Sequence, residues 1–163
     1  MRGEGRQIGC GPLAWATVAA GVVLMVLSGM VVEQLDEGPP PGYVGGDIPG
    51  QYRGRVNPFA LDDQRALAAG QAVYQAECAY CHGNNGTGDG PQAPYLEPAP
   101  ANFSAPSMLS AFRDHPDYVF WWVSEGVAET GMPAFKDELS ETERWQVITY
   151  AWYLAEQAAE TEG

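Results

Sequence analysis

The feature that most constrains how this chain folds is the run Cys78-Ala79-Tyr80-Cys81-His82. Two cysteines three positions apart followed directly by a histidine form the pattern for covalent attachment of c-type haem. The two thiols add to the haem vinyl groups, and the adjacent imidazole reaches the iron from one face. The hydrophobic core of a domain with this motif is therefore expected to form around the haem, a large flat group.

Other uses of the cysteine pair agree less well with the rest of the chain. Structural zinc needs two further Cys or His ligands, and only His115 remains after the N-terminal apolar stretch. A thioredoxin-like redox pair requires a βαβ setting, which the helical pattern does not provide. A plain disulfide between the cysteines would leave His82 unexplained. We therefore expect one covalently attached haem c.

A sixth iron ligand is expected from an exported methionine or histidine. Met132 is favoured because it lies in Gly131-Met132-Pro133-Ala134-Phe135, where glycine and proline keep the backbone out of a helix. Met108 is better explained by packing, and His115, which precedes a proline, by a loop or capping role. Ligation by His82 and Met132 predicts a low-spin iron with no open position.

A glycine-rich loop follows the motif. Gly86, Gly88, Gly90 and Pro91 allow the backbone to come close to a flat ligand, although a mobile surface loop gives the same composition.

The N-terminal part carries a long uncharged stretch. Residues 7–32 lack charge over 26 positions, and residues 11–32 would extend about 33 Å as a helix, enough to span a bilayer. No small-x-small cleavage site follows, which favours an uncleaved anchor over a cleaved signal peptide. Arg2 and Arg6 precede the stretch and acidic residues follow it, so residues 1–10 are expected in the cytoplasm and the rest on the periplasmic side of a bacterial membrane. Cys10 precedes the stretch and is interpreted as an unpaired interfacial thiol.

Residues 33–61 are expected to form a linker rich in glycine and proline. The linker contains more apolar residues than a simple spacer requires. Two explanations remain open: these residues pack on the chain's own domain, or they contact a partner protein. These residues are Tyr43, Val44, Ile48, Tyr52 and Phe59.

A helical domain is expected over residues 62–157, followed by a tail at 158–163. Asp62 or Asp63 can cap a helix to about Tyr80, and a second helix runs from Pro116 to Gly126. Ser140-Glu141-Thr142-Glu143 is a capping box for the last helix. The last helix has one apolar stripe at Val147, Tyr150, Ala151 and Leu154 and a second at Trp145, Ile148 and Trp152. No strand pattern is present, so the fold class is all-α, with irregular backbone between residues 83 and 106.

Charge excludes one class of function. The net charge is −13, with 21 acidic and 8 basic side chains and a single lysine, Lys136. Nucleic-acid binding depends on clustered Lys and Arg and is therefore not expected.

The motif, the Gly-Met-Pro-Ala-Phe loop and the aromatic last helix together resemble the class I c-type cytochromes over residues 62–157. The resemblance implies three to five helices around one haem, with His82 and Met132 as axial ligands. It also implies that the first and last helices cross at a glycine and an aromatic, and that a proline carbonyl, from Pro91 or Pro94, accepts a hydrogen bond from the His82 ring. The residues expected at the crossing are Gly70 and Tyr74 against Val147, Tyr150 and Ala151.

Residues 81–91 and 120–135 further resemble membrane-bound mono-haem subunits of respiratory complexes, most of all that of bacterial alternative complex III, which oxidises quinol. Subunits of haem-copper oxidases and free membrane-anchored cytochromes have similar segments. The lysine-rich docking face of soluble mitochondrial-type cytochromes is missing.

These expectations favour electron transfer over catalysis. A di-haem peroxidase would need a second Cys-x-x-Cys-His, and a cytochrome c′ would carry its motif near the C-terminus without a methionine ligand. The expected partners are membrane subunits of an electron-transport complex and a soluble electron acceptor. A mainly structural subunit is the remaining alternative, suggested by Trp121, Trp122, Trp145, Trp152 and Tyr153, although haem-pocket and helix packing account for most of these residues.

Overall fold

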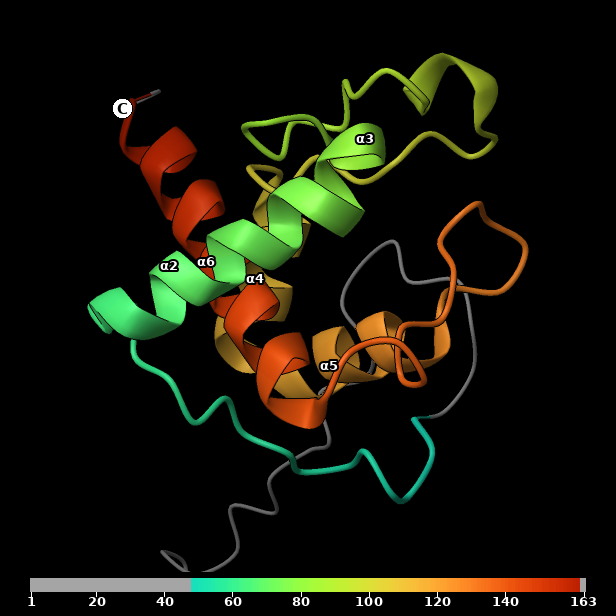
Figure 1. Ribbon diagram of the computed structural model, residues 1–163. Coiled ribbons are helices and arrows are strands. Elements are labelled where there is room, and N and C mark those ends of the chain that lie inside the picture. The colour runs from blue at the N-terminus through green and yellow to red at the C-terminus, as the bar shows by residue number, and fades with distance from the viewer. Residues whose placement is uncertain (1–47, 162–163) are drawn as a thin grey trace, which may run out of the picture. The chain divides into compact units, whose positions relative to one another are not determined.

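The computed structural model describes residues 48–161 (Figure 1). The expected cytoplasmic segment, membrane anchor and first half of the linker lie outside the described residues. Within 48–161, no helix combines the length and apolar character needed to cross a bilayer.

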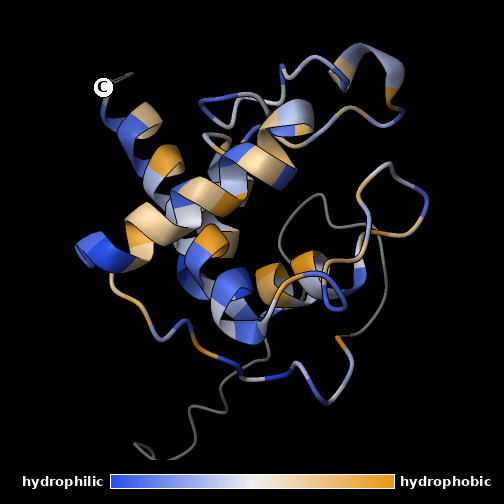
Figure 2. Ribbon diagram, in the orientation of Figure 1, coloured by the Kyte–Doolittle hydropathy of each residue, from blue (hydrophilic) through white to orange (hydrophobic). Residues whose placement is uncertain are grey.

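The described chain is helical and contains no strand, in agreement with the expected all-α class. In chain order its elements are α2 (Gln64–Val73), the π-helix η1 (Tyr74–Cys78), α3 (Ala79–His82), the 3₁₀ helix η2 (Ala93–Tyr95), α4 (Pro106–Asp114), α5 (Pro116–Glu125) and α6 (Glu141–Thr161). Figure 2 shows apolar and polar positions mixed along α2 and α6, as expected for helices with one buried face.

The first three elements form one continuous helical run that ends in the cysteine motif. Asp63 caps it, because its carboxylate accepts hydrogen bonds from the backbone N–H groups of Arg65 and Ala66, both at 3.0 Å. The run ends at Gly83, whose φ of 77° suits glycine. Between these ends, η1 widens one turn immediately before the motif, a local change that the helical pattern did not predict.

The first and last helices cross at Gly70, as expected. A Cβ atom at Gly70 would lie 2.0 Å from the backbone oxygen of Gln146, so only glycine allows α2 and α6 this approach. One turn later, the fully buried Tyr74 packs its ring 5.4 Å from that of Tyr150 and donates a hydrogen bond to the carbonyl of Gly83 at 2.7 Å. Figure 1 shows α2 passing over α6 at this point.

The capping box of α6 is confirmed. The backbone N–H and the hydroxyl of Ser140 both donate to the Glu143 carboxylate, at 2.8 and 2.7 Å, and the Glu143 N–H donates to the Ser140 hydroxyl at 3.3 Å. Both predicted stripes contribute to the core, through the buried residues Trp145, Val147, Ile148, Tyr150 and Ala151.

Helix α4 is an element that the sequence did not predict. It begins at Pro106. His115 occupies the cap position between α4 and α5 without a side-chain capping bond to α5, which agrees with the expected loop or capping position of His115. Arg113 holds α4 against α6 through two hydrogen bonds to the Glu156 carboxylate, which also accepts a bond of 2.7 Å from the Trp152 indole.

The second half of the expected linker packs on the chain's own helices. We call residues 48–57 the strap. Ile48 and Tyr52 are buried, the Gly54 N–H donates to Asp117 of α5 at 2.8 Å, and Asn57 donates to Thr149 of α6 at 3.0 Å. For these residues the packing explanation is confirmed.

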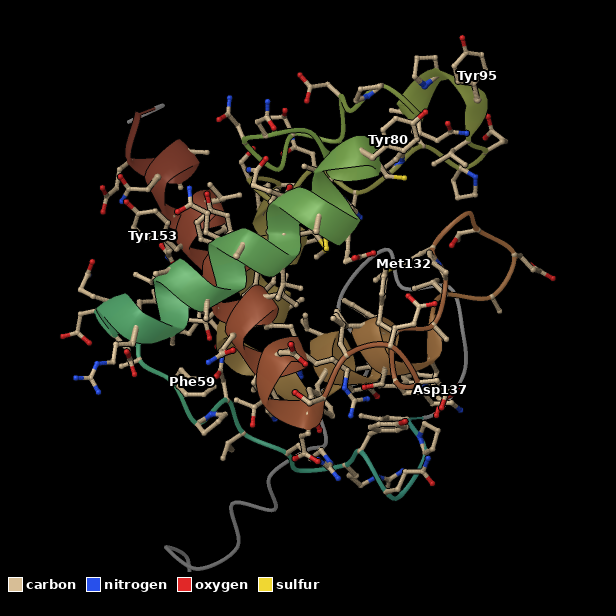
Figure 3. All side chains as sticks on the ribbon, in the orientation of Figure 1. Phe59, Tyr80, Tyr95, Met132, Asp137 and Tyr153 are labelled. Atoms are coloured by element: carbon tan, nitrogen blue, oxygen red, sulfur yellow. The ribbon has the colours of Figure 1, made fainter. Side chains whose placement is uncertain are left out.

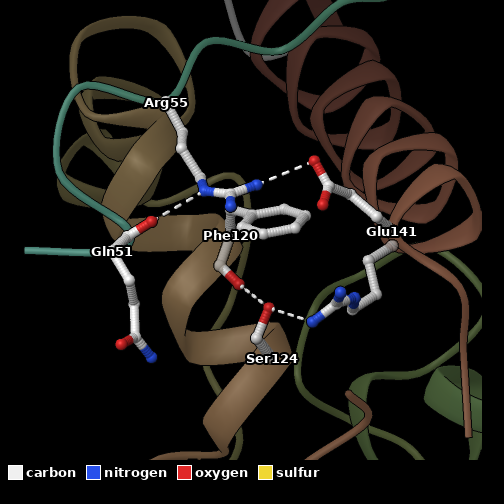
Figure 4. A network of polar contacts seen from close by, with 6 residues as sticks. Gln51, Arg55, Phe120, Ser124 and Glu141 are labelled. Atoms are coloured by element: carbon white, nitrogen blue, oxygen red, sulfur yellow. Dashed lines mark hydrogen bonds and ion pairs between the residues drawn. The ribbon is translucent and has the colours of Figure 1, made fainter. Parts of the chain in front are cut away.

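Arg55 joins the strap to α5 and α6 (Figure 4), and Arg144 of α6 makes a second contact with α5. Arg55 forms an ion pair of 2.7 Å with Glu141 and lies over the fully buried ring of Phe120, 5.1 Å from its centroid. Arg144 lies 4.8 Å from the same centroid and donates to the buried Ser124 hydroxyl at 2.6 Å. The Phe120 ring therefore interacts with two guanidinium groups, and these cation–π contacts stabilise the positions of both arginine side chains.

Candidate functional site

Two cavities lie next to the cysteine motif and share part of their lining. The first has a volume of about 350 Å³ and the second about 430 Å³. The residues common to both linings are Cys78, His82, Ala101, Val127 and Met132.

The lining of the first cavity is predominantly apolar. It comes from η1, α3, α4, α5 and α6, from the loop before α4 and from the methionine-bearing loop after α5. Its buried apolar members are Tyr74, Phe103, Phe112, Val119, Val147, Ile148 and Ala151. The second cavity is bordered by Cys81, by the loop around residues 96–101 and by residues 130–133. A large flat apolar group with polar edges suits such a site better than a hydrated ion.

Cys78 and Cys81 are free thiols, and both line the second cavity. Burial raises the pKa of the Cys78 thiol to about 12, with smaller contributions from the charges of Glu77 and Cys81. At neutral pH this group stays protonated, which disfavours the thiolate that a redox pair or a zinc ligand requires. Conversion to a neutral thioether is compatible with the same apolar surroundings.

His82 is oriented by the backbone. Its Nδ1 lies 3.1 Å from the carbonyl oxygen of Ala101, and because a carbonyl only accepts, Nδ1 carries the proton. Burial lowers the pKa of His82, and the bond to Ala101 opposes this shift more weakly, so the neutral ring is favoured. The ring also stacks on Phe103, with centroids 4.6 Å apart. Nε2 is thus left with the lone pair that a metal requires.

The carbonyl that orients His82 differs from the one expected. Pro91 and Pro94 were the expected sources, but neither lines a cavity, and Pro94 lies in η2. The expectation is corrected to Ala101, which follows Pro100. The physical reason is that the chain turns back after η2 and returns alongside the motif, a path set by contacts distant in sequence.

The glycine-rich loop also has a different role from the one expected. None of its glycines lines either cavity. A Cβ atom at Gly86 would lie 2.6 Å from the Phe103 ring, and one at Gly88 would lie 2.4 Å from the Pro100 carbonyl oxygen. The Gly86 carbonyl accepts the Phe103 N–H at 2.7 Å. The loop approaches the chain itself and supports the segment that carries the Ala101 carbonyl.

Met132 lies in an irregular loop between α5 and α6, as expected. We call residues 126–136 the methionine loop. The Met132 N–H donates to the Thr130 hydroxyl at 3.1 Å, and the Met132 carbonyl accepts the Val127 N–H at 3.3 Å. Met132 extends from this loop toward the side of the molecule where α3 ends (Figure 3).

The other two candidate ligands are placed differently. Met108 lines only the first cavity, and His115 lines neither. The structure therefore brings His82 and Met132 to the lining that the two cavities share and leaves His115 at the junction of α4 and α5.

Some residues of the site had no signal in the sequence. Ala101 acts through its main chain, so its side chain gives no indication of the role. Phe103 lies in a segment that the sequence predicts to be irregular. Only the contacts of its ring with His82, Phe112 and Tyr74 show that it packs beneath the site.

The donor set fits a covalently held haem. Two thiols, a neutral imidazole with an oriented ring and a thioether meet in apolar cavities, and these groups are the ones that would hold haem c. Within the described residues no cluster of three or more His, Cys, Asp or Glu side chains could hold a metal ion on its own.

Comparison with solved structures finds a likeness to a chain of the reducing HAO-like protein complex of Kuenenia stuttgartiensis, with 29% identity and a TM-score of 0.49. The match covers 64% of this chain and 52% of that chain, so the protein spans about half the length of this relative. No curated protein matches.

Comparison with protein families finds a match to "Cytochrome C oxidase, cbb3-type, subunit III" over residues 65–150, slightly more than half of the chain. The match begins in α2, includes the cysteine motif and the methionine loop, and ends in α6. The chain therefore belongs to this family: it has a cytochrome c domain, with covalently bound haem c and a role in electron transfer.

Proposed function

We propose that the protein is a membrane-anchored mono-haem cytochrome c that acts as the electron-transfer subunit of an electron-transport complex. The observation that carries the proposal is the meeting of a neutral, oriented His82 and Met132 at the lining shared by two apolar cavities, beside Cys78. The sequence contains a single Cys-x-x-Cys-His motif, which supports one haem.

Each residue has a distinct role in this proposal. Cys78 and Cys81 would hold the group covalently, His82 and Met132 would ligate its iron, and the Ala101 carbonyl fixes the imidazole orientation. When bound, the iron supplies reversible one-electron exchange. Two protein ligands give a low-spin centre and leave no position for oxygen or peroxide, which supports electron transfer and not catalysis by this chain alone.

Methionine opposite histidine raises the reduction potential relative to two histidines. The apolar lining acts in the same direction, since burial disfavours the additional charge of the oxidised centre. Such a centre suits the high-potential end of a chain that runs from quinol to a periplasmic acceptor.

The axial ligands are tested with Met132→Ala and, as a matched control, Met108→Ala. In the oxidised holoprotein the near-infrared methionine-to-iron charge-transfer band should disappear in Met132→Ala, the potential should fall, and carbon monoxide should bind the reduced form. Met108→Ala should keep the band, because Met108 borders only the first cavity. A band that persists in Met132→Ala contradicts the assignment.

For the complex, the sequence likeness of residues 81–91 and 120–135 supports a quinol-oxidising complex of the alternative complex III type. A haem-copper oxidase is the second candidate, and the match to the family of cbb3-type oxidase subunit III supports it. A free membrane-tethered shuttle is the third. Purification from native membranes in mild detergent distinguishes the three. Co-purification with subunits that oxidise quinol supports the first candidate, and co-purification with subunits that reduce oxygen supports the second. Purification of this chain without other subunits supports the third.

The topology is part of the proposal. Residues 11–32 form the retained anchor, residues 1–10 lie in the cytoplasm, and the haem domain lies on the periplasmic side of the bacterial cytoplasmic membrane. Mass spectrometry of the mature protein should find the N-terminal segment intact. A chain that starts at Met30 or later would show that the segment is a cleaved signal peptide.

A further inference from the structure

The methionine loop is closed at its base by backbone pairing with the end of α5. The Phe135 N–H donates to the Val123 carbonyl and the Lys136 N–H donates to the Ser124 carbonyl, both at 3.1 Å. Gly126 makes the closure possible, because a Cβ there would lie 2.7 Å from the Met132 carbonyl oxygen. The position of Met132 thus depends on how firmly residues 135 and 136 are held against α5.

One carboxylate reinforces this closure from both sides. Glu125, the last residue of α5, accepts a bond of 2.5 Å from Lys136 on one oxygen and a bond of 2.5 Å from the Tyr52 hydroxyl on the other. Lys136 lowers the pKa of Glu125 most, and the bond from Tyr52 lowers it further, so the carboxylate is charged at neutral pH. The strap therefore contacts the closing ion pair of the methionine loop directly.

Tyr52 is well placed to hold Glu125 because it is itself fixed. Its side chain is only 7% exposed, and its ring lies 6.1 Å from that of Phe120. Arg55 holds the following part of the strap against Phe120 and Glu141. Lys136 and Glu125 are more exposed, with 43% and 28% of their side chains accessible, and an ion pair this accessible stabilises little by itself. The buried phenol adds the rigid contact that the ion pair lacks.

From these contacts we propose that the strap is a positioning element for the axial methionine: Tyr52, through Glu125 and Lys136, keeps the methionine loop closed and Met132 on the iron. The inference rests on the proposed function, since it takes Met132 as the sixth ligand. Tyr52 touches neither cavity and acts only through the loop. It is a positioning residue and not a ligand.

Added imidazole provides the measurement, because it competes for the iron only when Met132 leaves. The full-length holoprotein in detergent is titrated with imidazole, and loss of the near-infrared band is followed. Tyr52→Phe removes one hydroxyl and should make imidazole bind about fivefold more tightly, which corresponds to about 1 kcal/mol of loop closure. Tyr95→Phe is the matched control, because Tyr95 is 80% exposed on η2 and lines neither cavity. Its imidazole affinity should equal that of the unchanged protein.

A second variant keeps the proposal testable if Tyr52→Phe does not fold. Lys136→Met changes a partly exposed residue on the other side of Glu125 and should likewise tighten imidazole binding. In a Glu125→Met background, Tyr52→Phe should add little further effect, because the shared carboxylate is already gone.

The outcomes separate the two proposals. Unchanged imidazole affinity in Tyr52→Phe and in Lys136→Met, with the band intact, overturns the role of the strap. Equal effects of Tyr52→Phe with and without Glu125 overturn the route through the carboxylate. A band that survives Met132→Ala overturns the ligand assignment itself.

Discussion

At the scale of single residues, the orientation of His82 depends on a backbone atom and on a glycine that never touches the ring. The carbonyl of Ala101 accepts a hydrogen bond from Nδ1 of His82. Gly88 packs against the backbone of residues 100 and 101, which carries that carbonyl. A hydrogen bond from Nδ1 raises the basicity of the imidazole and its electron donation to a metal. Gly88 is therefore expected to influence the potential of the iron.

Gly88→Ala tests this influence. The new Cβ would lie 2.4 Å from the Pro100 carbonyl oxygen, so residues 100 and 101 must move and the bond to His82 should lengthen. A less basic imidazole stabilises the oxidised iron less, and redox titration should show a higher midpoint potential.

The matched control is Gly54→Ala. Gly54 has a similar positive φ, 72° against 77°, but no neighbour within 4 Å. Gly54→Ala should lose about 1–2 kcal/mol of unfolding free energy from backbone strain. Gly88→Ala should lose more than this, because its Cβ also meets the Pro100 carbonyl oxygen. Only Gly88→Ala should raise the potential, because Gly54 lies in the strap and strain there can act only by loosening Met132, which lowers the potential. No rise in Gly88→Ala would show that Gly88 has no special link to His82.

Residue-scale prediction from sequence succeeded where chemistry is carried by side chains close together in the chain. The cysteine motif, the Asp63 cap and the irregular setting of Met132 can each be read from a few neighbouring letters. It failed for the carbonyl of Ala101, because any residue has a carbonyl and only the return of the chain after η2 selects this one.

At the scale of elements, the close crossing of α2 and α6 supports one wall of the site. Tyr74, Val147 and Ala151 line the first cavity. Tyr74 begins η1, which continues α2, and the other two lie in α6, all within about a turn of Gly70 or Gln146. The separation of these helices therefore sets the width of the cavity.

Gly70→Ala should separate the two helices. Alanine favours a helix interior by roughly 1 kcal/mol over glycine, but its Cβ would lie 2.0 Å from a backbone oxygen that cannot rotate away. The clash should dominate and lower the free energy of unfolding by about 3 kcal/mol, measured by denaturant titration of the holoprotein.

The control for this change is Gly50→Ala, since Gly50 has no neighbour within 4 Å and no positive φ. It should change the unfolding free energy by less than about 0.5 kcal/mol. A stabilised Gly70→Ala variant would mean that helix propensity, and not the crossing, dominates at this position.

The sequence left the packing of the strap open between two explanations and did not predict α4, and both have the same physical cause. The strap and α4 are short and have weak local patterns, and both are stabilised by distant partners: the strap by Glu125, Asp117 and Thr149, and α4 by Glu156. Helix α6 has 21 residues and a capping box, so its local signal was sufficient.

At the scale of the whole chain, basic side chains are few, and most of those after the expected anchor contact the chain's own groups. After the expected anchor, residues 33–163 contain 20 acidic and 6 basic side chains. Among the basic side chains, Arg55, Arg113 and Lys136 form ion pairs, and Arg144 is held against Phe120 and Ser124. These four cations thus serve internal structure, and the field around the haem domain is negative.

A negative field of this size should attract a basic soluble redox partner and repel an acidic one. Association of opposite charges slows as salt screens them beyond a Debye length of roughly 8 Å at physiological ionic strength. Stopped-flow mixing of the reduced full-length holoprotein with a basic soluble cytochrome should therefore show second-order rates that fall steeply from low to high salt. An acidic acceptor of similar potential, measured in parallel, should react slowly at low salt and faster as salt increases. If the basic partner instead reacts at a rate independent of salt, the docking contact is apolar, and the acidic residues serve only to keep the domain soluble.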